Sequence, residues 1–294
     1  MASSILVSVT RRWVPSRRRG PGARLLRHPS ARIGGVLLAL VLTGAIFAPA
    51  LTPYDPVKIA PEQRLQGPSA AHPLGNDLYG RDTFTRVLYG GRISLGVGVL
   101  SVGLSLLVGG TIGALSGYWG GWFDAGVMRF SDILLAFPAI LLAIGLLAFL
   151  VGGFWNVVLA IAIVYTAPMA RVARAAVLTV RHEEYVDAAG VIGAGDARIM
   201  RLHILPNAIA PLVVESTLRL ALAILAEAAL SFLGLGTQPP APTWGQMIAE
   251  GRSVMTFSSW PAIGPGLAIT TTVLGFNLLG DGIRDALDPH IHPA

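Results

Sequence analysis

The sequence predicts an all-α, polytopic membrane protein with six transmembrane helices. Of its 294 residues, 53% are hydrophobic and only 13% are charged, and the mean hydropathy is +0.63. A soluble domain carries about 25% charged residues. The apolar residues also lie in blocks near the ~20 residues that a helix needs to cross ~30 Å of hydrocarbon. Alternating strand segments of about ten residues, typical of a membrane barrel, are absent.

The apolar blocks give the predicted elements in chain order. They cover residues 33–51, 94–116, 133–151, 157–176, 208–235 and 262–279. Lipid offers the backbone no hydrogen-bond partners, so each block should form a helix. Pro138 lies inside the third block and should kink that helix.

The charge distribution predicts the orientation. Residues 1–32 contain no acid and form a basic arm, and positive charge beside a span marks its cytoplasmic side and contacts anionic lipid. Nucleic-acid binding is the weaker interpretation of this arm. An even number of spans then places both termini in the cytoplasm of a cell whose inner or plasma membrane holds the chain. The arm contains Arg11, Arg12, Arg17, Arg18, Arg19, Arg24, Arg27 and Arg32.

The domain organisation follows from this orientation. After the first span, residues 52–93 form an extracytoplasmic loop, and residues 94–280 form a core of five spans. Residues 177–207 of that core face the cytoplasm, as does the tail 281–294. The outer loop carries five basic residues (Lys58, Arg64, Arg81, Arg86 and Arg92), which counts against the orientation, although its length and its acids soften the objection. Ala48-Pro49-Ala50 also permits a cleaved signal peptide as an alternative.

The residue inventory gives no catalytic, cofactor or metal site. Cysteine is absent and the six histidines are scattered, with no H-E-x-x-H sequence. The only lysine is Lys58, and no G-x-x-x-x-G-K-[ST] sequence occurs. That sequence is the phosphate-binding loop of many ATPases, and its lysine contacts the phosphates of ATP. The chain therefore cannot supply this lysine, and we expect it not to be an enzyme.

The stretch from Tyr185 to Asn207 suggests a docking role. It is moderately polar, and it belongs to a connection of about thirty residues, where a simple one needs about four to six. A short amphipathic helix is predicted at 183–189. There the small Ala188 and Ala189 would allow close approach by another protein.

This stretch resembles the E-A-A-x3-G-x9-I-x-L-P loop of ABC importer permeases. Asp187-Ala188-Ala189, Gly193 and His203-Ile204-Leu205-Pro206 align with it, Asp187 replacing Glu and His203 replacing the first Ile. The H-I-L-P-N ending is similar to the peptide branch of the family. The resemblance implies that this loop, including Tyr185, forms a coupling helix that docks on an ATPase subunit.

Further segments resemble the C-type permease of dipeptide and oligopeptide importers. They lie at 72–92, 123–138, 226–236 and 276–289. The resemblance implies a B-type permease partner, two ATP-binding subunits that hold ATP and magnesium, and an extracytoplasmic substrate-binding protein. The expected substrate is a di- or oligopeptide. Related permeases for nickel, glutathione or oligosaccharides share these motifs and stay as alternatives.

Charged residues within the fifth span are candidates for the translocation path or its gate. Glu215 and Arg219 are spaced i, i+4 and can simply pair. Glu227 should face protein or water, and a structural hydrogen-bonding role is its alternative. An ion-gradient secondary transporter is the alternative function from another class. Such transporters need more intramembrane acids or broken helices than the sequence shows.

Overall fold

The computed structural model describes residues 28–150 and 152–287. Seven of the eight arginines of the basic arm, and the end of the C-terminal tail, lie outside these residues. Within them every regular element is helical, apart from one isolated bridge between Asn76 and Asp82. The all-α prediction is therefore confirmed.

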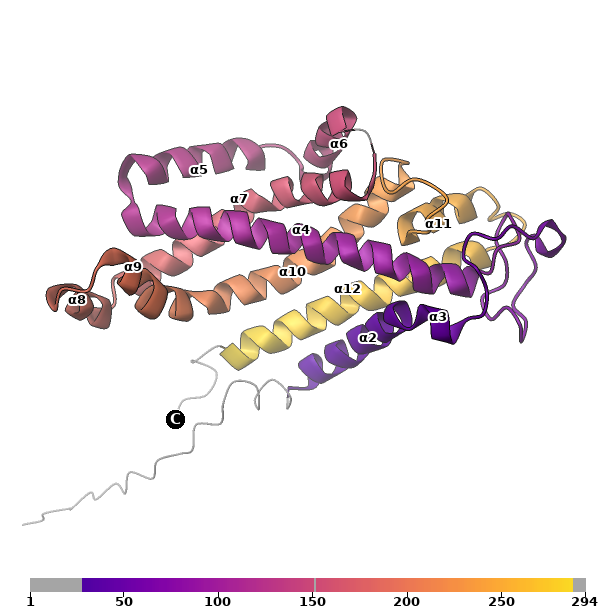
Figure 1. The fold of residues 1–294 in the computed structure, drawn as a ribbon, viewed down its shortest axis with the longest axis horizontal. Helices are drawn as coiled ribbons and strands as arrows, with labels where there is room; N and C mark the ends of the chain where they lie inside the picture. The colour runs from indigo at the N-terminus through magenta and orange to yellow at the C-terminus, as the bar shows by residue number, and fades with distance from the viewer. Residues whose placement is uncertain (1–27, 151, 288–294) are drawn as a thin grey trace, which may run out of the picture.

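Most long helices run along one common direction (Figure 1). Five single helices are long and apolar enough to cross a membrane, and α5 and α6 together could supply a sixth span. A 3₁₀-helix covers Pro61–Gln63 and a π-helix covers Met200–Ile204. The α-helices are α2 (Pro29–Ile46), α3 (Ala48–Leu51), α4 (Thr83–Trp119), α5 (Gly121–Leu135), α6 (Ala139–Leu150), α7 (Phe154–Arg181), α8 (Glu184–Val191), α9 (Asp196–Ile199), α10 (Leu205–Phe232), α11 (Trp244–Arg252) and α12 (Trp260–Leu287).

The third predicted span is not one helix over 133–151. Helix α5 begins well before it at Gly121 and ends at Leu135, and α6 begins at Ala139 after a bend of 91°. The break contains Pro138, which lacks the N–H that a continuing helix would need. The expected kink at Pro138 is confirmed, but the two helices are nearly perpendicular.

The predicted outer loop 52–93 is also too long, because α4 begins at Thr83. Asp82 caps this helix by accepting a 2.6 Å hydrogen bond from the Thr85 amide. Helix α4 has 37 residues. The segment between α10 and α12 contains the nine-residue α11, whose mixed composition does not resemble a span.

Close contact between α4 and α7 forms the centre of the bundle. A Cβ added to Gly113 would lie 2.1 Å from the carbonyl oxygen of Ala170. Glycines one turn away on either side, Gly109 and Gly117, meet α7 in the same way. Small residues at this spacing let two membrane helices approach closely.

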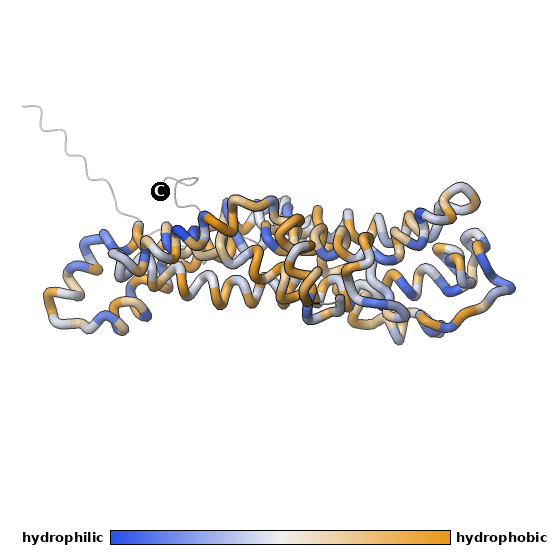
Figure 2. Tube along the Cα trace, turned by 90° about the horizontal axis from the view of Figure 1, so that it is seen from above, coloured by the Kyte–Doolittle hydropathy of each residue, from blue (hydrophilic) through white to orange (hydrophobic). Residues whose placement is uncertain are grey.

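Helix α2 packs along α12 at the edge of the bundle (Figure 1). Gly34 of α2 lies against the backbone at Gly275 and Leu279, and Gly282 lies against Ala31. Hydrophilic residues are concentrated toward the two ends of the molecule (Figure 2). This distribution fits a protein whose middle lies in lipid and whose ends lie in water.

Candidate coupling and pathway sites

Residues 182–204, which we call the protruding segment, project beyond one end of the bundle with α8 at their tip (Figure 1). The segment is shorter than the predicted 177–207, because α7 extends to Arg181 and α10 begins at Leu205. Its tip is apolar and open, with Val191 88% and Ile192 84% exposed. Two large apolar side chains are thus adjacent and open at the tip of the segment.

The underside of the protruding segment packs into a small hydrophobic core that it shares with α4, α7 and α10. Ala189 faces this core and is only 6% exposed, whereas Ala188 is open to solvent. The expectation that both alanines allow close approach by another protein is thus wrong for Ala189, which permits close packing within the chain. The core consists of Ala114, Ala176, Val177, Val186, Ala189, Ile199, Ile204 and Ala208.

Gly193 ends α8 in a conformation that favours glycine. Its φ is +85°. The Gly193 amide donates to the Gly190 carbonyl (3.0 Å), and the Ala194 amide donates to the Ala189 carbonyl (3.0 Å). This pair of bonds is a Schellman motif, which satisfies the last carbonyls of a helix. The glycine of the loop sequence therefore turns the chain sharply from α8 toward α9.

Polar contacts fasten the protruding segment to the ends of α4 and α7. The Tyr118 hydroxyl donates to Asp196 Oδ1 at 2.8 Å. The guanidinium of Arg181 lies 5.4 Å from the centre of the Tyr118 ring, a cation–π distance. Tyr118 of α4 thus holds α9 in place, and Arg181 of α7 packs on the ring of that tyrosine.

The π-helix connects the protruding segment to α10 without a break. The Leu205 amide donates to the Met200 carbonyl, five residues back. Pro206 follows and has no N–H to donate, so a wider turn suits this position. Asp196–Phe232 is thereby one continuous helical rod of 37 residues. Helix α9 is therefore continuous with the α10 span.

The remaining loop residues lie at the surface. Asp187, Leu205 and Pro206 are exposed. The rings of Tyr185 and His203 lie 6.5 Å apart, centre to centre. Tyr185 on α8 and His203 on the π-helix thus face one another across the segment.

The predicted pair in the fifth span is confirmed as an ion pair. Arg219 Nε lies 2.6 Å from Glu215 Oε1, and both side chains are about four-fifths buried. The Arg219 guanidinium also lies 5.3 Å from the centre of the Tyr165 ring on α7. Pairing compensates both charges within the membrane.

Glu227 lies in a buried polar node between α10, α4 and the start of α11. It is 1% exposed and accepts a 2.7 Å hydrogen bond from the Ser231 hydroxyl. Ser94 and Thr243 also lie against this carboxyl group. The Ser94 hydroxyl in turn accepts a hydrogen bond from the Trp244 amide at 3.3 Å. This geometry favours the structural alternative for Glu227.

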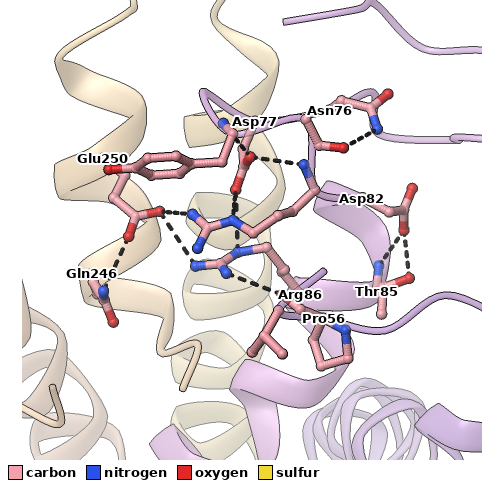
Figure 3. Close-up of polar contacts among 12 residues, drawn as sticks. Pro56, Asn76, Asp77, Asp82, Thr85, Arg86, Gln246 and Glu250 are labelled. Atoms are coloured by element: carbon pink, nitrogen blue, oxygen red, sulfur yellow. Dashed lines mark hydrogen bonds and ion pairs between the residues drawn. The ribbon is translucent and has the colours of Figure 1, made fainter. Parts of the chain in front are cut away.

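An ion cluster at the opposite end was not predicted. Asp77, Arg86 and Glu250 of α11 lie together in this cluster (Figure 3). Arg81 bonds Asp77 through Nε and Glu250 through a terminal nitrogen, each at 2.6 Å. Arg86 lies 3.3 Å from the same Glu250 carboxylate and donates to the Pro56 carbonyl at 3.1 Å. The i, i+4 spacing of Asp77 and Arg81 is the only local sign of it in the sequence.

A bundle of long apolar helices with one fastened, projecting segment defines a membrane permease subunit. The chain belongs to the family described as binding-protein-dependent transport system inner membrane component, whose model matches residues 109–293. A second model, the N-terminal transmembrane domain of oligopeptide transport permease C, matches residues 22–68. The chain is thus a permease of the ABC importer class, a multi-pass protein of the inner membrane.

Relatives cover nearly the whole chain. It is 46% identical to the dipeptide transport system permease protein DppC of Alkalihalophilus pseudofirmus, covering 90% of this chain and 88% of that protein. It is also 46% identical to the glutathione transport system permease protein GsiD of Pectobacterium atrosepticum (91% and 89% covered). The di/tripeptide permease DppC of Pseudomonas aeruginosa is 43% identical (91% and 90% covered).

Two solved structures share the fold. One is an inward-facing MetNI methionine ABC transporter, with a TM-score of 0.58 at 18% identity, covering 69% of this chain and 97% of that one. The other is an amino acid ABC transporter with histidines, with a TM-score of 0.55 at 20% identity, covering 69% and 94%. At this identity the likeness concerns the fold alone.

Proposed function

We propose that this chain is one of two permeases that form the import path for short peptides, and that the protruding segment couples it to an ATPase subunit. ATP and magnesium would be bound by two such partner subunits. A substrate-binding protein would deliver the peptide from outside. The exposed apolar tip at Val191 and Ile192 is the observation that carries this proposal.

The tip suits docking because it is apolar, open and rigidly supported. An interface needs buried apolar anchors whose position is fixed before binding. The Schellman turn, the small core around Ala189 and the Tyr118–Asp196 bond provide that fixation. The unbroken rod into α10 supplies the route by which closure of the ATPases would reach the span.

The proposed orientation places the protruding segment and both termini in the cytoplasm. The basic arm supports this direction. The arginines at the other end, which count against it, include Arg81 and Arg86. Both are buried in the ion cluster, so their presence there has a structural reason unrelated to orientation.

The names of the relatives support peptides as the substrate class. The relatives named for dipeptides and for glutathione are equally similar to this chain, at 46% identity each. Glutathione is itself a tripeptide, so a short peptide is the substrate chemistry that the two names share. Glu215, Arg219 and Glu227 stay candidates for the path, with Glu227 better suited to holding helices together.

The test compares Ile192→Asp with Phe257→Asp in the full complex. Phe257 is also 84% exposed but lies between α11 and α12, at the other end. We expect Ile192→Asp to weaken retention of the ATPase subunits roughly 30-fold, the loss of a binding hot spot. Phe257→Asp should retain them. ATP-dependent peptide uptake in vesicles should therefore fall in Ile192→Asp, in proportion to the loss of the ATPase subunits.

Equal retention of the ATPases by both variants would overturn the docking proposal. Peptide uptake that persists without any ATPase subunit would overturn the importer mechanism itself and favour an ion-gradient transporter. Uptake of nickel or an oligosaccharide in place of peptide would overturn only the proposed substrate and leave the importer mechanism standing.

A further inference from the structure

An apolar groove of about 230 Å³ opens between α2, α4 and α12, at the end of the bundle that carries α11. None of the fourteen residues that line it is charged. Trp244 forms part of its wall, with its indole N–H donated to the Val87 carbonyl at 2.9 Å. The groove therefore offers a ligand almost nothing but apolar contact.

The rim of the groove is exposed on the outside of the bundle. Leu40 of α2 and Leu267 of α12 both line it and are 68% and 59% exposed. Both belong to helices long and apolar enough to span the membrane. An apolar cavity of about 150 Å³ is sufficient for one benzene ring, so this groove has room for part of one hydrocarbon chain.

A cation stands beside the groove where α2 ends. Arg92 lies one turn after Leu88, on the same face of α4 that lines the groove. Its guanidinium donates to the carbonyls of Ala45 (2.7 Å) and Ile46 (2.8 Å). Among residues 28–150 and 152–287 no acid pairs with it. The planar guanidinium has further N–H groups, which match the oxygens of a phosphate.

We propose that the groove binds one acyl chain of an anionic phospholipid, whose headgroup phosphate is held by Arg92. The lipid belongs to the leaflet on the side of the membrane opposite the protruding segment. The acyl chain fills the space between α2 and α12. Farther from this end of the bundle, the two helices contact each other directly through small residues. The charge on Arg92 selects anionic over zwitterionic lipid.

The test uses the assembled transporter in phosphatidylcholine vesicles with a photoreactive acyl-chain probe. The probe is either phosphatidylglycerol or phosphatidylcholine, at equal mole fraction, and adducts are mapped by mass spectrometry. We expect adducts at 40–45 and 264–271 to exceed those at the exposed Val36 and Leu107. One interfacial arginine is worth roughly a fivefold preference for the anionic probe.

Three variants separate the two halves of the proposal. Arg92→Gln should bring the preference for phosphatidylglycerol close to one, while Arg64→Gln, an exposed outer arginine away from the groove, should keep it. Gly44→Leu should fill the groove, since its only near neighbour is a flexible Leu88 methyl at 3.1 Å. Groove adducts should then fall while those at Val36 persist. Ala268→Leu serves the same purpose if Gly44→Leu does not assemble.

Groove adducts no more frequent than those at Val36 and Leu107 would overturn the binding site, as would adducts insensitive to both filling variants. A preference for phosphatidylglycerol that survives Arg92→Gln would overturn the role of Arg92. None of these outcomes depends on substrate or ATP, so they are distinguishable from failure of the transport proposal.

Discussion

Arg81 and Glu250, 169 residues apart in the chain, are joined by a 2.6 Å contact between guanidinium and carboxylate. The contact links the segment before α4 to α11, and Arg86 binds the same carboxylate. Both arginines are at least nine-tenths buried. Buried charges are tolerated only when they are paired. The cluster therefore requires the segment before α4 and α11 to stay together.

Glu250→Ala should therefore destabilise the protein strongly. It leaves Arg81 and Arg86 with Asp77 alone, and breaking a buried pair costs about 3–5 kcal/mol. The loss would be measured as a lower melting temperature of the purified complex. Glu62→Ala, which removes an exposed acid from the same outer segment, should leave the melting temperature unchanged. Equal melting temperatures for both variants would contradict the structural role of the cluster.

Gly113→Ala should disturb the α4–α7 contact. The new Cβ would lie 2.1 Å from a backbone carbonyl, which cannot move away without displacing α7. Gly103→Ala is the matched control on the same helix, since nothing lies within 4 Å of its Cβ position. That control should stabilise α4 by about 0.5–1 kcal/mol. Thermal unfolding of the two variants should shift in opposite directions, and shifts in the same direction would refute the close approach.

Gly193→Ala should loosen the protruding segment while leaving the spans intact. A side chain at φ +85° costs about 1–2 kcal/mol, which raises the open fraction of the segment roughly fivefold to thirtyfold. Trypsin cleavage after Arg198 and Arg201 in membranes would report that opening. Gly190→Ala, within α8 and with free space around it, should slow cleavage. Unchanged cleavage in Gly193→Ala would show that the turn does not hold the segment.

Glu227→Leu should destabilise the protein, whereas Glu227→Gln should not. Leucine removes the acceptor of the Ser231 hydroxyl and leaves buried polar groups unpaired, at a cost of about 1–3 kcal/mol. Glutamine keeps an acceptor and loses only the charge. Melting temperature and peptide uptake should both be close to wild type in Glu227→Gln. A stable Glu227→Gln protein without uptake would instead assign the charge to the translocation path.

The positions of the spans could be predicted because they depend on local composition. The predicted 94–116 and 157–176 lie inside α4 and α7, since apolar length is a property of a single segment. The same is true of the Glu215–Arg219 pair, which one helical turn brings together whatever surrounds it. The kink at Pro138 was likewise predictable, because proline lacks the amide hydrogen.

The tertiary structure decided what depends on the packing of distant segments. No local pattern shows that Ala189 faces inward while Ala188 faces outward, because both are small and adjacent. Pro138 predicts a kink after α5, but not that the bend is 91°. Glu250 meets Arg81 only because α11 folds back over the start of α4. Sequence by itself therefore determined which segments enter the membrane, and packing determined which polar side chains they bring together.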